Sequence, residues 1–399
     1  MSAHHLTKEI TNFEDFIRRI LKIVFWVLLF LPLVGVPVYY LLDTVFHFGV
    51  DVFGLITVHP DQLISLQLQL ISTEPFHSLF IWTTFPGFTF AALFVTFFAM
   101  LWERKLLAKM QLRVGPQYAG KYEGILQMVA DLVKLLFKEL VTPNAVDKPI
   151  FWSVPFASMA IAGALLSLVP LGPNTYLADP PIGVIMIFAI IGFFPIVTLL
   201  AGWASNSKYP FLGGLRALHQ MISYEIPLIL SLLGVVILSG TLDIMKVVVS
   251  QEGIWYILLQ PIGAIVFFIA SLAELERIPF DLPEADTELV AGWVTEYTGM
   301  GFGAVFLGIY IKLYALSGLF TAFFLGGWLG PSFLPPELWF LLKTFLVMTA
   351  MLIPRGTMPR IRIDLMIRVG WTRLLVLSFA NIFLTMLLVS LGIFRIGGL

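Results

Sequence analysis

Long apolar runs, separated by short polar segments, dominate the pattern of this chain. A helix needs about 20 apolar residues to cross a bilayer, and it satisfies its own backbone hydrogen bonds there. Nine runs reach that length, at 20–42, 84–102, 150–172, 181–204, 218–240, 256–275, 298–328, 337–354 and 373–394. The pattern predicts an all-α fold, a polytopic membrane helical bundle. The first run is too long for the apolar part of a signal peptide and lacks a small-residue cleavage site, so we expect a retained helix.

The polar segments between these runs differ in their content of lysine and arginine. If the N-terminus is inside, 20 of the 24 basic residues lie in inner segments or at the inner ends of spans. Basic residues accumulate on the cytoplasmic side of membrane proteins. The distribution therefore predicts an inner N-terminus and an outer C-terminus. Lys246, Lys312, Lys343 and Arg395 are the exceptions.

One inner segment, 123–139, has a helical period of its own. Polar residues such as Asp131 and Lys134 recur at three- and four-residue spacing, and Val129 and Leu136 belong to the opposite face. This spacing predicts an amphipathic helix at the membrane surface or beneath the bundle.

Composition agrees with a membrane protein and excludes several kinds of site. Hydrophobic residues make up 59% of the 399 residues and charged residues 12%. The net charge of −1 gives no indication of a nucleic-acid partner, and the absence of cysteine excludes thiolate-bound iron–sulfur clusters and cysteine-ligated zinc. The six histidines show no spacing typical of a metal site or a haem pair. The glycines at 299–303 open an apolar helix and follow no strand, so they indicate close helix packing rather than a nucleotide loop.

The stretch 273–297 concentrates acidic residues beside the sixth run. Its carboxylates are Glu274, Glu276, Asp281, Glu284, Asp286, Glu288 and Glu296, and its one base is Arg277. Acidic side chains at membrane depth are costly, and they usually mark a proton or ion pathway. Buried carboxyls also titrate near neutral pH and share protons as a coupled set. This stretch is therefore the first candidate for function.

Two acids belong to the spans themselves. Glu225 lies in the fifth run, two residues before Pro227, and no base lies within its own helix. We therefore favour a proton-relay role over that of a structural acid with a basic partner. Glu274 ends the sixth run, and helical neighbours two residues apart face different directions. We expect Glu274, rather than Glu276, to face the interior.

Prolines divide the rest of the acidic stretch. Pro279 and Pro283 prevent a continuous helix, so the segment between them is expected to line a cavity. Pro283 can begin a short helix, and capping is then the simplest role for Asp286. On that helix Glu284, Glu288 and Glu296 would form a slanting stripe at four-residue spacing. Glu139, from the amphipathic segment, is expected to close the row.

Several blocks in a fixed order give the chain a family resemblance. They are WERK (102–105), QLRVGP (111–116), ADLVKLLFKE (130–139), DK (147–148), GWASNSKY (202–209), LRA (215–217), SYE (223–225), the stretch 273–297 and PRIRID (359–364). With these blocks the chain resembles the H-type membrane subunit of respiratory complex I, also called the first ND subunit. That family has eight transmembrane helices, beginning with the one that ends at Glu103. The resemblance therefore implies an extension at 1–83, with one extra transmembrane helix and an outer segment, before an eight-helix quinone-chamber domain at 84–399.

The resemblance also implies a role for individual residues. A proton relay would contain Glu139, Glu225, Glu274, Glu284, Glu288 and Glu296. The quinone chamber would contain Arg104, Arg113, Arg277, Asp281, Arg360 and Arg362. Quinone would be the substrate, and this chain would hold no iron–sulfur cluster, haem or metal. The implied partners are a cluster-bearing hydrophilic arm, antiporter-like membrane subunits and lipid, with no nucleic acid.

The favoured function is that of a non-redox membrane subunit of a proton-pumping quinone oxidoreductase. Its electron donor would be NAD(P)H or ferredoxin, and its location a bacterial inner membrane rather than a thylakoid or organelle membrane. The alternative is the anchor subunit of a membrane-bound energy-converting hydrogenase. A free-standing ion transporter is a third class, but the sequence shows no inverted repeat or paired broken helices. The subunit composition of the purified complex would separate these functions.

Overall fold

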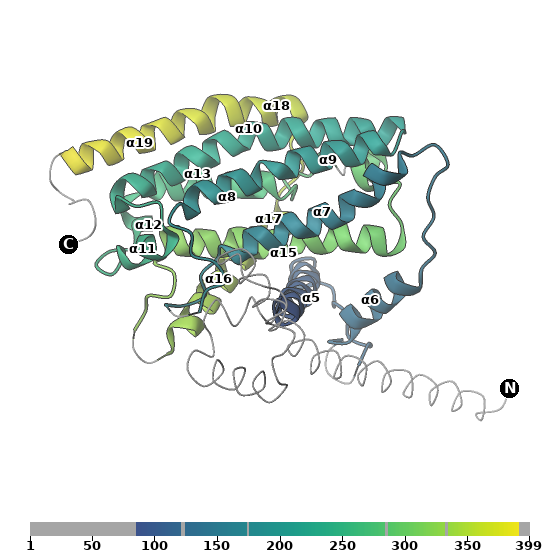
Figure 1. The fold of residues 1–399 in the computed structure, drawn as a ribbon, viewed down its shortest axis with the longest axis horizontal. Coiled ribbons are helices and arrows are strands. Elements are labelled where there is room, and N and C mark those ends of the chain that lie inside the picture. The colour runs from purple at the N-terminus through teal and green to yellow at the C-terminus, as the bar shows by residue number, and fades with distance from the viewer. Residues whose placement is uncertain (1–84, 121–123, 174, 284–285, 332–333, 391–399) are drawn as a thin grey trace, which may run out of the picture. The chain divides into compact units, whose positions relative to one another are not determined.

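The fold comes from a computed structural model that describes residues 85–120, 124–173, 175–283, 286–331 and 334–390 (Figure 1). Helices and turns make up this described part, and it contains no strand. The extra helix expected at 20–42, the extension at 1–83 and Glu284 lie outside the described residues. The predicted all-α class is confirmed.

In the described part of the chain, helices follow one another in the order that the eight apolar runs from residue 84 onward predict. Six of them are long and apolar enough to span a membrane. Three are single helices: Lys148–Ser167 (α7), Lys208–Ser239 (α10) and Gly299–Phe324 (α15). The other three are composed of successive elements: Gly183–Ala204 contains α8 (Gly183–Ile191) and α9 (Phe193–Ala204), Pro336–Thr357 contains α16 (Pro336–Leu352) and α17 (Pro354–Thr357), and the last is Ile363–Ser390. The last of them contains α18 (Ile363–Arg368), a π-helical turn η2 (Val369–Leu374) and α19 (Leu375–Ser390). The other two runs correspond to α5 (Phe85–Met110) and the shorter apolar α13 (Pro261–Glu274). The polytopic helical bundle is thus confirmed for the described part of the chain.

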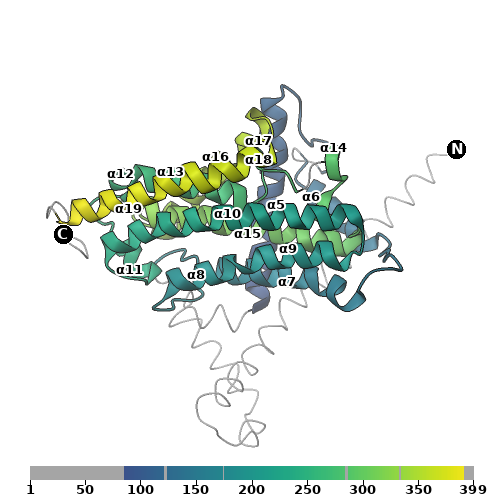
Figure 2. The same ribbon diagram turned by 90° about the horizontal axis from the view of Figure 1, so that it is seen from above.

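Helix α10 is the centre of the packing. It contacts α9, α13 and α19, and Figures 1 and 2 show it running beside all three. Glycines allow the closest approach, because a Cβ atom on Gly214 would lie 2.9 Å from the Thr198 carbonyl oxygen of α9. A Cβ atom on Gly202 would lie 2.5 Å from the Pro210 carbonyl oxygen. Small residues therefore bring the two backbones together, as is common between membrane helices.

Short elements connect the spans. They are α6 (Gln127–Phe137), α11 (Ile244–Val249), α12 (Tyr256–Leu259), α14 (Asp286–Leu289) and a 3-10 turn η1 (Gly292–Val294). Helix α6 confirms a helix in the amphipathic segment, but it stops at Phe137 because Lys138 has an extended backbone. α6 contacts α15, where a Cβ atom on Gly303 would lie 3.2 Å from Leu135. This contact agrees with the packing role expected for the glycines at 299–303.

The acidic stretch differs from the single helix expected after Pro283. Helix α14 begins at Asp286 and ends at Leu289, because Val290 and Gly292 adopt left-handed backbone conformations with φ of 67° and 59°. Glu288 therefore lies on α14, whereas Glu296 lies beyond η1. The prediction that these two acids share one helical stripe is wrong, since the helix is broken between them.

Candidate functional site

A buried carboxylate on α5 forms the centre of a cluster of charged residues. Glu103 is 1% exposed. Its Oε1 atom accepts a hydrogen bond from Arg277 Nη1 at 2.5 Å and a second one from Arg355 Nη1. Its Oε2 atom accepts a hydrogen bond from the Tyr310 hydroxyl at 2.7 Å. Glu103 thereby connects α5 with α15, α17 and the segment after α13.

Arg277 remains a cation in this cluster although it is almost fully buried. Burial by itself lowers the pKa of a guanidinium, but the Glu103 carboxylate and the Tyr310 side chain outweigh it and raise the pKa of Arg277 above its ordinary value. The Arg277 Cζ atom also lies 4.8 Å from the centre of the Tyr310 ring, within the range of a cation–π contact. A fixed positive charge is thus held at the end of the bundle.

A small cavity of about 50 Å³ lies beside this cluster. It is lined by Leu275, Glu276, Arg277, Ile278, Asp281, Phe306, Ile309 and Arg355. The Asp281 carboxylate forms an ion pair with Arg360 at 3.0 Å. The structure therefore brings Arg277, Asp281 and Arg360 of the predicted chamber residues to one place.

Glu276 has a different position from the one expected. The spacing argument left it outside the interior, yet it is 7% exposed and its Oε2 atom accepts a hydrogen bond from Trp293 Nε1 at 3.2 Å. The argument assumed a helix, whereas α13 ends at Glu274 and Glu276 has a left-handed φ of 52°. Glu274 and Glu276 are therefore both buried, and the expectation for Glu276 is corrected.

A second buried cluster lies within the spans. Glu274 is 1% exposed, and its Oε1 atom accepts a hydrogen bond from Lys312 Nζ of α15 at 2.8 Å. Lys312 is 3% exposed and also donates to the Glu274 backbone carbonyl at 2.7 Å. On α10, Glu225 is half-buried, and the charges that act on it are those of Glu274 and Lys312. The expectation that Glu274 faces the interior is confirmed.

The other predicted acids that the structure describes, Glu139, Glu288 and Glu296, are not among the groups that pair with Lys312 or act on Glu225. Glu288 is an exposed residue that pairs with Arg216 at 2.5 Å, and Glu139 is exposed as well. Glu296 is half-buried. The chain brings Glu139 near the end of the acidic stretch, because the Thr298 hydroxyl donates to the Glu139 carbonyl at 3.5 Å. That contact is made by the backbone and not by the carboxylate.

Arg360 pairs with the lining residue Asp281, whereas the other three predicted arginines do not line the small cavity. Arg104 pairs with Asp131 of α6 at 2.6 Å, and Arg113 donates to Gln111 at 2.7 Å. Arg362 is exposed. Arg355 lines the small cavity but was not predicted as a site residue. Its position in the sequence indicated only that it is one of the basic residues of the inner segments.

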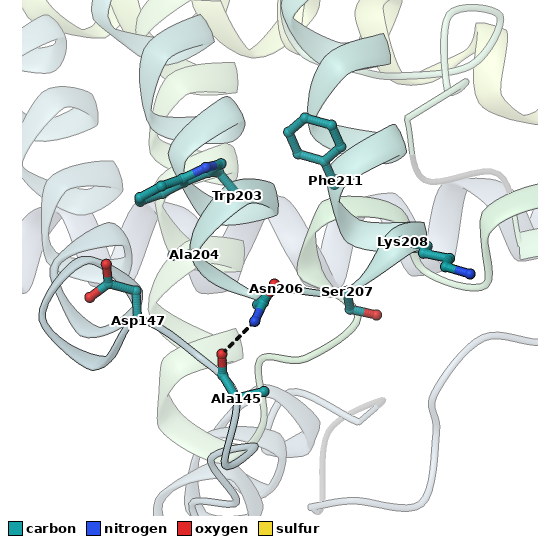
Figure 3. A pocket seen from close by; sticks show the side chains of 8 residues that line it. All are labelled: Ala145, Asp147, Trp203, Ala204, Asn206, Ser207, Lys208 and Phe211. Atoms are coloured by element: carbon teal, nitrogen blue, oxygen red, sulfur yellow. Dashed lines mark hydrogen bonds between the residues drawn. The ribbon is translucent and has the colours of Figure 1, made fainter.

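A larger, open cavity of about 670 Å³ lies at the turn between α9 and α10 (Figure 3). Ala145, Asp147, Trp203, Ala204, Asn206, Ser207, Lys208 and Phe211 line it. The Asn206 side-chain amide donates to the Ala145 backbone carbonyl at 2.9 Å. The backbone N–H of Asp147 donates to the Ala204 backbone carbonyl at 3.0 Å. The DK and GWASNSKY blocks thus meet here, where they fasten the segment before α7 to the α9–α10 turn. No predicted site residue lines this cavity.

Comparisons with known proteins find one family over most of the chain. The sequence profile of the NADH dehydrogenase family matches residues 84–386. The H subunit of NADH-quinone oxidoreductase from Bacillus cytotoxicus is 46% identical over 305 residues, which cover 76% of this chain and 92% of that protein. The proteins of the same name from Bacillus thuringiensis and Bacillus cereus are 45% identical over the same shares of both chains.

Proposed function

Since this chain belongs to the family of H subunits of NADH-quinone oxidoreductases, which are membrane subunits of complex I, we propose that it forms a wall of the quinone chamber. We propose further that it couples quinone reduction to proton translocation. The observation that carries this proposal is the Glu103–Arg277–Arg355 cluster beside the small cavity, in which Glu103 and Arg277 are buried and Arg355 is exposed. Guanidinium groups are strong hydrogen-bond donors, and they suit a carbonyl oxygen that gains negative charge during reduction.

The size of the cavity favours a shared chamber. A volume of about 50 Å³ is far below the range for binding an organic ligand, which starts at about 300 Å³. The chain therefore supplies one wall, and other subunits of the complex complete the space. The lining favours Arg277 and Asp281 as wall residues and adds Arg355. Arg360 and Glu103 form ion pairs with these wall residues. Arg104, Arg113 and Arg362 remain proposed chamber residues at greater distance from this cavity.

The connection from the chamber to the membrane runs along the chain itself. Arg277 and Glu276 line the cavity, and Glu274, two residues before Glu276, pairs with Lys312 inside the bundle. A charge that develops at the cavity thus lies near the first buried acid of the proposed pathway. The proposed relay comprises Glu139, Glu225, Glu274, Glu284, Glu288 and Glu296.

The rest of the proposal concerns the complex around this chain. Electrons would reach the quinone from NAD(P)H or ferredoxin through iron–sulfur clusters in other subunits, because this chain has no cysteine to hold one. The chain would lie in a bacterial cytoplasmic membrane, with its N-terminus inside and its C-terminus outside, in contact with lipid, a hydrophilic arm and antiporter-like subunits. The family match begins at residue 84, which supports an extension at 1–83.

Replacing Arg277 tests the chamber. In the purified complete complex, Arg277→Gln is expected to lower quinone reduction at least tenfold, about 1.4 kcal/mol of activation free energy, and to leave reduction of the upstream clusters intact. Lys246→Gln is the control, because it removes a basic side chain that is 72% exposed and pairs with Asp243 away from the cavity. An unchanged quinone-reduction rate in Arg277→Gln would refute the role of this wall. Hydrogen evolution without quinone reduction by the unmodified complex would favour the hydrogenase alternative.

A further inference from the structure

Lys312 is held in the span α15 by contacts that favour its charged form. Its ammonium group donates to the Glu274 carboxylate at 2.8 Å and to the Glu274 backbone carbonyl at 2.7 Å. That carbonyl belongs to the last residue of α13, where the helix dipole favours a cation. The Nζ atom also lies 3.8 Å from the centre of the Phe194 ring, a cation–π contact. Two of these three contacts persist whether or not the Glu274 carboxyl is ionised.

Two carboxyl groups share this one cation. The Oε2 atom of Glu274 is buried and has no hydrogen-bond partner among the described residues. Glu225 comes from the neighbouring helix α10, and Glu274 and Lys312 are the charged groups that act on it. Gly192 leaves room for its carboxyl, because a Cβ atom there would lie 3.0 Å from Glu225 Oε1. The site thus contains one base and two acids.

The balance of charge at this site determines how many protons its two carboxyl groups hold. An uncompensated charge is expensive in a low-dielectric interior, whereas a paired and hydrogen-bonded charge is tolerated. With Lys312 charged, the neutral arrangement has one carboxylate and one protonated carboxyl. The direct ion pair puts the negative charge on Glu274, which leaves the proton to Glu225.

We propose that Lys312 is the positioning residue of a proton-holding site, in which Glu225 carries one proton and Glu274 carries the negative charge. This inference rests on the proposed coupling function and deepens it. If the ammonium group leaves Glu274 and approaches Glu225, the neutral arrangement requires the proton to move. The O–H bond of Glu225 then breaks, an O–H bond forms on Glu274, and neither the net charge nor any oxidation state changes.

The proton count can be measured in the purified complete complex by infrared spectroscopy. Protonated carboxyls have a C=O stretching band that shifts in D₂O, and spectra of variants can be compared with those of the unmodified complex. Lys312→Met removes the cation, so the site is expected to gain one protonated carboxyl. Lys312→Arg keeps the cation and should restore the original intensity. No gain of intensity in Lys312→Met would overturn the proposal.

Lys343 provides a matched control. It is also a buried lysine within a span, but its ammonium group donates to the carbonyls of Leu325, Gly327 and Leu329. No carboxylate pairs with it among the described residues. Lys343→Met should therefore leave the carboxyl band unchanged. An equal gain of intensity in both methionine variants would mean that the band does not report the charge balance at Lys312.

Conservative substitutions locate the proton. Aspartate keeps a carboxyl group but moves it, so Glu225→Asp is expected to shift the frequency of the band and Glu274→Asp to leave it in place. If only Glu274→Asp shifts the band, then Glu274 rather than Glu225 carries the proton, and the proposal is overturned. Both variants keep the charge count, so they test it even where Lys312→Met does not assemble. The spectra require no turnover, so their outcome is independent of the quinone-reduction test of Arg277.

Discussion

Tyr310 donates a 2.7 Å hydrogen bond to Glu103, a residue 207 positions earlier in the chain. Two residues further along α15, Lys312 binds Glu274. Side chains two apart on a helix point in different directions. One helix thus supports both the arginine cluster beside the small cavity and the buried lysine–glutamate pair. A displacement of α15 would alter both sites together, which gives the proposed coupling a physical basis.

Glu103→Gln is expected to damage the arginine cluster most. Glutamine keeps the volume but removes the negative charge, and breaking a buried ion pair costs about 3–5 kcal/mol. We expect a lower thermal midpoint of the purified complex and at least a tenfold slower quinone reduction. Tyr310→Phe removes one hydrogen bond of about 1 kcal/mol and should have a milder effect. An equal loss in the two variants would argue against a special role for the carboxylate.

Glu225→Gln is expected to impair proton pumping and to leave assembly of the complex intact. The amide preserves the shape of the side chain but neither binds nor releases a proton. We expect an assembled complex whose number of protons moved per electron is reduced, as measured in sealed vesicles. Glu252→Gln is the control, because it makes the same change at an exposed residue. A normal proton-to-electron ratio in Glu225→Gln would exclude the relay role.

Asp179, in the loop before α8, gives a pH-dependent prediction. Partial desolvation, the neighbouring Asp243 carboxylate and a hydrogen bond with Asp243 raise the pKa of the Asp179 carboxyl from 3.8 to about 6, against the opposing effect of Lys246. Between these two values the folded state binds more protons than the unfolded state, so stability falls as pH rises through this window. Asp179→Asn removes the titrating carboxyl group, and with it the loss of stability at higher pH. The thermal midpoint should rise most above about pH 6, with a gain that shrinks towards pH 4. A gain that is equal at all pH values would contradict this cause.

Gly213 is predicted to be irreplaceable at the contact between α10 and η1. A Cβ atom there would lie 2.7 Å from the Trp293 backbone nitrogen and 2.8 Å from Gly292 Cα. Gly213→Ala must therefore displace the turn that carries Trp293, the donor to Glu276, at a cost of about 1–3 kcal/mol. Gly163→Ala on α7 is the control, because nothing lies within 4 Å of its new atom. The first variant should lower the thermal midpoint and the second should not.

The spans could be predicted from the sequence because the length of an apolar run is a strong signal. All eight runs from residue 84 onward correspond to helices, and only their details differ. The run at 256–275 is divided at Gln260, which precedes Pro261 and has a φ of −129° and a ψ of 57°. A residue before proline disfavours the helical conformation, so this division had a readable cause.

The sites were only partly predictable. Glu274, Arg277 and Asp281 stood out because their chemistry is concentrated in one short stretch. Glu103 was missed as a site residue because its partners lie 174, 207 and 252 positions away, and no local pattern contains such distances. Lys312 did leave a signal as an exception to the charge asymmetry. A lysine within a span requires a buried partner, and that requirement alone would have marked it.

The cluster of Arg277, Tyr310 and Arg355 around Glu103 also has a consequence for the biogenesis of the protein. Chains are synthesised from the N-terminus, so α5 reaches the membrane long before Arg277, Tyr310 and Arg355 exist. Until then, the carboxylate must remain near the aqueous boundary or accept a proton. The complete set of ion pairs can therefore form only after residue 355 has been synthesised. A chain truncated before Arg355 would lack one of the two arginines that bind Glu103.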